Sequence, residues 1–266
     1  MGLTRTDGPL SPSAPKSINY RLDGPPHKLL MHPFPRRVRA EFAGRTVLDT
    51  RAGMLLHETA LLPRFYVPEA DLDASAFVAT DHTTHCPFMG DASYRSLHAG
   101  DRVVENALWA YPDPVPAAPW LAGYASLYWD AADAWYDEDE QVFAHLTDPY
   151  TRVDIRPTSR HVQVLAGDVV VAESTRPTVL NETGLPARWY LSPDDVHVAL
   201  EPSATSMRCP YKGRSSYWTA RVPDGRELVD VAWSYPDPLP EASRIAGLVS
   251  FQHDEITVLV DGDPVG

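Results

Sequence analysis

The sequence predicts an all-β protein made of two tandem copies of one small domain. The hexapeptide that starts at Trp109, Trp-Ala-Tyr-Pro-Asp-Pro, returns almost unchanged at Trp233 as Trp-Ser-Tyr-Pro-Asp-Pro, 124 residues later. Short alternating segments separated by Gly and Pro turns fill both halves, as is typical of antiparallel strands. No sustained 3.6-residue periodicity predicts a long helix, so we expect only short helical turns, at Asp71 to Phe77 and Pro240 to Ile245.

The expected strands follow the same order in each half. Alternation from Val38 to Asp49, broken by Ala43-Gly44, predicts a hairpin, and Val162 to Glu173 repeats it. A second hairpin is expected across the turns at Gly100 and Gly225. The last strands are expected at 134–136 and 256–260.

The pattern divides the chain into three parts. Residues 1–35 are rich in Pro, Gly and Ser and predict a flexible N-terminal arm, whose end has enough apolar side chains to dock as a strap. Residues 36–148 and 149–266 are the two expected domains, and we expect them to associate as an intramolecular pseudo-dimer.

Composition excludes several classes of partner and site. The 266 residues are 44% apolar, and 23 basic against 36 acidic residues give a net charge of -13, which disfavours nucleic acid and anionic membranes. We find neither a membrane-spanning run nor a signal-peptide core. Two cysteines rule out a four-cysteine zinc site and favour the cytoplasm, and no cofactor is expected.

Three groups of residues are candidates for a functional site in each half. The first group pairs a carboxylate with an arginine and a tyrosine. Its members are Glu58, Arg64 and Tyr66 in the first half and Glu182, Arg188 and Tyr190 in the second. Two interpretations stay open: a structural ion pair, or a carboxylate and guanidinium presented to a ligand.

The second group surrounds a Cys-Pro turn. Cys86 and Cys209 occupy equivalent places, and each is either a reactive thiol or a packed or pocket-wall side chain, which makes both candidate ligand-binding residues. His85 precedes Cys86 and titrates near neutrality, which makes the first half the candidate for acid-base chemistry, whereas Lys212 is the catalytic candidate of the second. Metal binding by His82, His85 and Cys86 is an open alternative, although the second half lacks equivalent ligands.

The third group is aromatic. A Trp and a Tyr two residues apart share one strand face, so both point to the same side. The rings either fill a core or form a cage for a flat or cationic ligand. The candidate ligand-binding rings are Tyr94, Trp109, Tyr111 and Tyr128 in the first half and Tyr217, Trp218, Trp233 and Tyr235 in the second.

Together these motifs resemble the DUF427 family. They are the hairpin, the Glu followed by Pro-x-Arg-x-Tyr or a close variant, the Cys-Pro-Tyr-Lys-Gly-x-x-x-Tyr-Trp run at 209–218, and the hexapeptide at Trp233. The resemblance covers two copies. It implies a β-tent or Mss4-like fold of two antiparallel sheets with a cleft between them, without the four-cysteine zinc that many relatives of that fold carry.

We therefore expect a small-molecule-binding protein with an aromatic-walled cleft in each half. Hydrolytic or isomerising acid-base chemistry with Glu, Arg, Tyr and His is one form of this hypothesis, and a non-catalytic binding or scaffold protein is the alternative. Nucleotidyl transfer has less support, because neither half shows Gly-Ser followed by paired carboxylates. The copies differ at the cleft: Met89 stands where the second has Lys212, and Tyr128 where it has Gln252.

Overall fold

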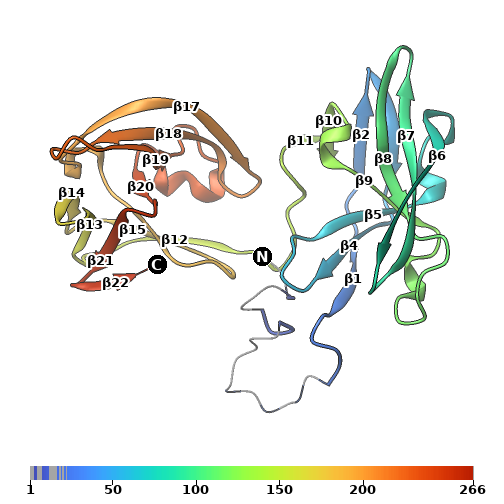
Figure 1. The fold of residues 1–266 in the computed structure, drawn as a ribbon, viewed down its shortest axis with the longest axis horizontal. Coiled ribbons are helices and arrows are strands. Elements are labelled where there is room, and N and C mark those ends of the chain that lie inside the picture. Colours follow the sequence, from blue (N-terminus) through green and yellow to red (C-terminus); the bar gives the residue numbers. More distant parts are fainter. Residues whose placement is uncertain are drawn as a thin grey trace. The chain divides into compact units, whose positions relative to one another are not determined.

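The computed structural model describes residues 3–4, 8–11, 17, 19, 21 and 23–265 of the chain. They form antiparallel sheets joined by turns and short 3-10 helices, which confirms the predicted all-β class. The chain divides into two compact units, Met1–Asp148 and Pro149–Gly266, and Figure 1 shows the strands of each. We describe the units separately.

The first half contains two sheets. A larger sheet has the strand order β1-β4-β5-β9-β8-β7-β6, and a smaller sheet has the order β11-β10-β2-β3. The strands are β1 (Leu29–Phe34), β2 (Val38–Phe42), β3 (Arg45–Thr50), β4 (Gly53–Glu58), β5 (Arg64–Pro68), β6 (Phe77–Cys86), β7 (Gly90–Ala99), β8 (Arg102–Ala110), β9 (Tyr124–Leu127), β10 (Ala134–Asp137) and β11 (Glu140–Val142).

The second half repeats this topology strand for strand. Its sheets have the orders β12-β15-β16, β17-β18-β19-β20 and β14-β13-β21-β22, and a bridge between Leu191 and Val249 links the first two where Val67 pairs with Ala125 in the first half. The strands are β12 (Val153–Pro157), β13 (Val162–Ala166), β14 (Val169–Ser174), β15 (Thr178–Glu182), β16 (Arg188–Tyr190), β17 (Ala199–Cys209), β18 (Gly213–Arg221), β19 (Glu227–Ser234), β20 (Val249–Phe251), β21 (Ile256–Val260) and β22 (Asp263–Val265).

Short 3-10 helices occupy some of the connections. Two of them fall in or next to the predicted helical turn at 71–77, and another coincides with the turn predicted at 240–245. The helices are η1 (Glu69–Asp71), η2 (Ala74–Ala76), η3 (Pro119–Leu121), η4 (Trp129–Ala131), η5 (Pro193–Asp195) and η6 (Pro240–Ile245).

The end of the predicted N-terminal arm is part of the first domain. Leu29 to Phe34 form β1, which pairs antiparallel with β4 from Leu29 opposite Glu58 to Phe34 opposite Gly53. The apolar side chains of this segment explain the docking, since Phe34 is buried in the larger cluster and Leu29 and Met31 pack partly buried against the smaller one. In the rest of the arm, residues 1–2, 5–7, 12–16, 18, 20 and 22 lie outside the described residues.

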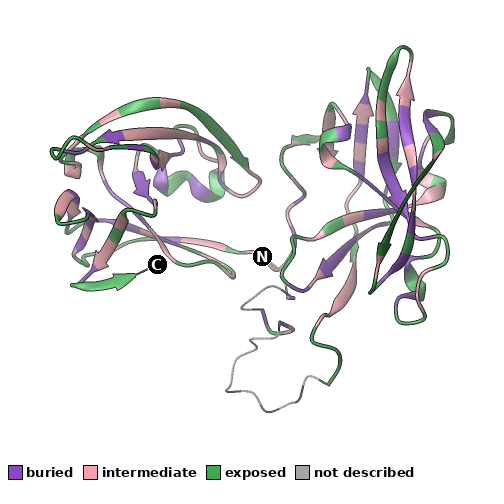
Figure 2. Cartoon of the chain, in the orientation of Figure 1, coloured by how far each residue is buried: buried purple, intermediate pink, exposed green. Residues whose placement is uncertain are grey.

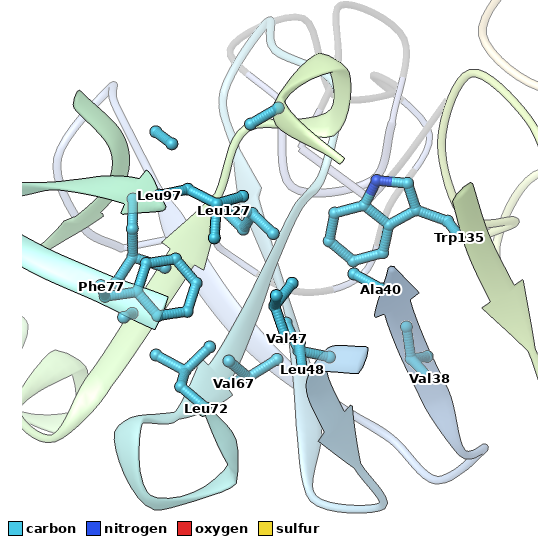
Figure 3. Packing of buried hydrophobic residues seen from close by; sticks show 14 of the residues in the cluster. Val38, Ala40, Val47, Leu48, Val67, Leu72, Phe77, Leu97, Leu127 and Trp135 are labelled. Carbon is cyan, nitrogen blue, oxygen red and sulfur yellow. The ribbon is translucent and has the colours of Figure 1, made fainter. Parts of the chain in front are cut away.

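Each half buries two apolar clusters. The larger cluster of the first half lies between its sheets, and Figure 3 shows Val38, Ala40 and Trp135 within it, together with Phe77 and Leu97. Strands β2 and β13 bury alternate residues in the same pattern, as period-2 sequences predict. Figure 2 shows buried residues along the strands of both halves. The second cluster of each half is smaller and contains many of the predicted site residues.

Candidate functional site

The same tyrosine-tryptophan pair stands at the centre of the smaller cluster in each half. Trp109 Nε1 donates a hydrogen bond to the Tyr66 hydroxyl at 3.1 Å, and Trp233 Nε1 donates to the Tyr190 hydroxyl at 3.1 Å. The rings meet edge to face, with centroids 6.1 Å and 6.4 Å apart. The duplication therefore preserves side-chain geometry as well as strand order.

A glycine turn fastens the Tyr-Pro-Asp-Pro segment to this cluster. Gly213 has φ +99°, and a Cβ there would lie 3.3 Å from the carbonyl oxygen of Asp237. The next segment is held by a hydrogen bond from Leu239 N to the Lys212 carbonyl at 3.1 Å. In the first half Gly90, with φ +108°, stands against Asp113 in the same way. The two repeated motifs are thus one packed unit that fixes residue 212.

The second half has a cavity of about 250 Å³ beside this unit. Its lining combines aromatic rings with charged and amide side chains from several strands. The lining residues are Leu180, Glu182, Leu185, Arg188, Tyr190, Lys212, Tyr217, Asp230, Trp233, Tyr235 and Gln252. The cavity therefore joins the carboxylate-arginine-tyrosine group, the lysine of the turn and the aromatic group that the sequence suggested separately.

Glu182 and Lys212 form an ion pair in the wall of the cavity. Lys212 Nζ donates a hydrogen bond to Glu182 Oε2, and the two side chains are 11% and 8% exposed. A charge withdrawn from water to this extent needs a partner, and here each side chain is the partner of the other. Together they add no net charge to the cavity.

The two other charged residues of the cavity have different surroundings. Hydrogen bonds from Ser203 and Thr205 lower the pKa of Asp230, so its carboxyl group stays ionised. The Arg188 guanidinium lies over the Trp233 ring, 5.9 Å from its centroid, and forms no ion pair with the described acidic side chains. Arg188 thus has no direct ion-pair partner among the described acidic side chains, although the ionised Asp230 lines the same cavity.

Burial keeps two of the cavity tyrosines, Tyr190 and Tyr235, protonated. Desolvation raises the pKa of Tyr190 and Tyr235 above the usual value, which the hydrogen bond from Trp233 only partly offsets at Tyr190. The same cause raises the pKa of Tyr66 and Tyr111 in the first half. These hydroxyls therefore serve as hydrogen-bond donors and acceptors rather than as bases.

The first half arranges the equivalent residues differently. Met89 is buried in the smaller cluster at the place of Lys212, and the Tyr128 ring lies against Trp109 with centroids 4.5 Å apart at the place of Gln252. The carboxylate has another partner here: His27 Nε2 lies 2.8 Å from Glu58 Oε1, and its ring stacks on Phe88. Tyr94 and Tyr111 are buried in the cluster.

The chain matches the family described as Domain of unknown function (DUF427) twice, over residues 30–138 and 154–262. The chain belongs to this family. No curated protein matches it. Each match begins within the first strand of its half, β1 or β12, and ends just after β10 or β21.

Several predicted residues of the DUF427 copies lie apart from the smaller clusters. His85 is 67% exposed and pairs with Asp91, while its neighbour Cys86 packs against the cluster, because successive residues of a strand face opposite sides. For the same reason Tyr217 lines the cavity, whereas Trp218 packs against the larger core and donates to Ser234. Arg64 is exposed on β5.

The cysteines and histidines do not assemble a metal site in the described part of the chain. No group of three or more potential ligands comes together there. Cys86 and Cys209 are free thiols that pack against the smaller clusters, and His82 lies edge-on to Tyr94. None of the described helices has both the length and the apolar composition that a membrane span requires.

The sequence reasoning missed three polar site residues. Asp230 lines the cavity from a bulged position of β19 with φ 55°, and its only sequence signal is an acidic residue inside an apolar alternation. Gln252 was noticed only as a difference from Tyr128. His27 was assigned to the arm, and no local signal pairs it with Glu58, since that contact depends on the pairing of β1 with β4.

Proposed function

We propose that the second DUF427 copy binds a small molecule that carries one carboxylate and a flat apolar ring. The observation that carries the proposal is Arg188, a guanidinium in the wall of a cavity of about 250 Å³ without an ion-pair partner among the described residues. A planar guanidinium matches a carboxylate with two parallel hydrogen bonds.

The other lining residues support the rest of this ligand. Trp233 offers an aromatic wall for a flat ring, and Tyr190, Tyr235 and Gln252 supply polar groups at fixed places. Asp230 stays ionised and disfavours a second anionic group. The cavity volume limits the ligand to a compact molecule, so a monocarboxylate with one ring is the best match.

The proposal describes binding, with acid-base turnover as a further step. Glu182 is the candidate acid-base residue, since it lines the cavity and accepts a hydrogen bond from Lys212 Nζ. The open cavity favours a binding protein over an inert scaffold. We also propose a cytoplasmic location, which the two free cysteines support.

Benzoate and its neutral analogue benzamide test the carboxylate contact. In titration calorimetry, Arg188→Gln should weaken benzoate binding by about tenfold or more, because a hydrogen bond to a charged group contributes roughly 1.5–3 kcal/mol. Benzamide binding should change little. Arg64→Gln, the matched change in the first half, should leave both affinities unaltered.

Equal benzoate affinity in wild type and Arg188→Gln would overturn the carboxylate assignment. Equal losses for benzoate and benzamide would also contradict it, since they would indicate a collapsed cavity rather than a lost charge contact.

A further inference from the structure

The first half holds an imidazole ring against its carboxylate in the geometry of a bound ligand. The His27 ring stacks on Phe88 with centroids 3.8 Å apart and planes 12° from parallel. His27 Nε2 lies 2.8 Å from Glu58 Oε1, and because a carboxylate accepts, this nitrogen carries the proton and donates. A free imidazole can form both contacts equally well.

The carboxylate at this position has a nitrogen partner in both halves, but from different parts of the chain. In the second half the partner is Lys212, which the glycine turn fixes inside the domain. In the first half Met89 stands there instead, and the partner comes from the segment that precedes β1. The first half thus takes the nitrogen partner of its carboxylate from outside its sheets.

The segment that carries His27 is attached next to the site. Lys28 N donates to Thr59 Oγ1 at 2.9 Å, and Thr59 N donates to the Lys28 carbonyl at 3.1 Å. These bonds keep His27 near Glu58 at high effective concentration. The His27 and Glu58 side chains are 24% and 13% exposed, and Phe88 is 38% exposed, so the ring covers a site that opens to solvent.

We propose that Glu58 and Phe88 form a binding site for a flat nitrogen base of the imidazole class, and that His27 of the same chain occupies it. When His27 withdraws, Glu58 is left with no hydrogen-bonding side chain among its described neighbours and Phe88 exposes its face. A desolvated carboxylate beside an aromatic face selects a compact N–H donor that is planar and carries positive charge. An external ligand therefore competes with His27.

Imidazole itself is the probe, measured by titration calorimetry or by the NMR shifts of residues around Phe88. Wild type should bind it weakly, and His27→Ala should bind it about tenfold more tightly or better, because the internal competitor is gone. His27→Phe keeps a ring on Phe88 without the donor and should stay at the wild-type level. Thr151→Ala, the equivalent position of the second half, should change nothing.

The gain must depend on the carboxylate. In the His27→Ala background, Glu58→Gln should remove the increase in imidazole affinity, and 1,3-dimethylimidazolium, which stacks but cannot donate, should bind no better than it does to wild type. Equal imidazole affinity in wild type and His27→Ala overturns the proposal. An increase that survives Glu58→Gln overturns it as well. The thermal midpoint of unfolding of each variant shows whether it still folds. His27→Phe removes the hydrogen-bond donor while a ring still covers Phe88, so it separates loss of the donor from exposure of the site.

Discussion

The two halves share a strand order and a Tyr-Trp hydrogen bond, yet they complete the same carboxylate in opposite ways. Glu182 receives Lys212 from its own domain and borders a cavity with Arg188, whereas Glu58 receives His27 from the preceding segment and Met89 takes the place of Lys212. The difference between Lys212 and Met89 at the turn therefore decides whether the partner of the carboxylate comes from within the domain. Among the described residues, the second half presents an arginine without an ion-pair partner, whereas the carboxylate of the first half is paired with an imidazole from a segment that precedes its sheets.

The largest expected effect comes from breaking the buried ion pair. Lys212→Met places the first half's residue in the second and leaves Glu182 desolvated and unpaired, which should cost about 3–5 kcal/mol in the free energy of unfolding. Urea unfolding followed by hydrogen exchange of residues 149–266 measures it. The double variant Lys212→Met with Glu182→Gln should recover much of the loss. A cost below about 1 kcal/mol would show that the pair is solvated.

The glycine turn should be the next most sensitive feature, and equally so in both halves. Gly213→Ala and Gly90→Ala each force a side chain into a left-handed conformation with a backbone oxygen 3.3 Å away, and each should cost about 1–3 kcal/mol. Gly225→Ala is the control, since its φ is +93° but nothing lies within 4 Å of the added atom. If all three variants lose the same stability in urea unfolding, contact with the Tyr-Pro-Asp-Pro segment contributes nothing.

The tyrosine-tryptophan bond predicts a smaller effect that the halves share. Tyr66→Phe and Tyr190→Phe each leave a tryptophan N–H without its acceptor, which should cost about 1 kcal/mol. Chemical unfolding of both variants gives the comparison. A large loss in one half with none in the other would mean that the similar geometry does not carry similar energy.

The smallest expected effect per residue is a loss of stability at alkaline pH, caused by ionisation of the buried tyrosines. The pKa of Tyr66 and Tyr190 is raised in the folded protein above the unfolded value near 10, so the native state holds these protons more tightly. Their contribution to stability is complete below that pH and is lost as the pH rises above it. The free energy of unfolding should therefore fall above about pH 10, and less steeply in Tyr190→Phe. An unchanged slope in that variant would contradict the assignment.

The sequence was sufficient for features that repeat or alternate. The repeated motifs at Trp109 and Trp233 were enough to align the two copies. The alternation that starts at Val38 predicted the hairpin, and the structure places the buried residues of its first strand in the core. Strand alternation also explains why His85 and Trp218 face away from Cys86 and Tyr217. Those faces were predictable in principle once the strand that carries each residue was known.

The rest depends on contacts between distant strands. Arg188, Lys212 and Gln252 line one cavity because β16, the β17–β18 turn and the end of β20 meet, and no local pattern encodes that meeting. The contact of His27 with Glu58 likewise requires β1 to join the sheet beside β4. The sequence therefore predicted which types of residue form the site better than it predicted in which half those residues line a cavity.

The indole N–H resonances of Trp109 and Trp233 test this difference most directly. Each is assigned by a Trp→Phe variant and followed in ¹H–¹⁵N spectra while benzoate is added to the whole chain. We predict that the Trp233 signal shifts in a saturable way and that the Trp109 signal, whose ring is covered by Tyr128, stays in place. Equal movement of both signals, or movement of Trp109 alone, would contradict the account.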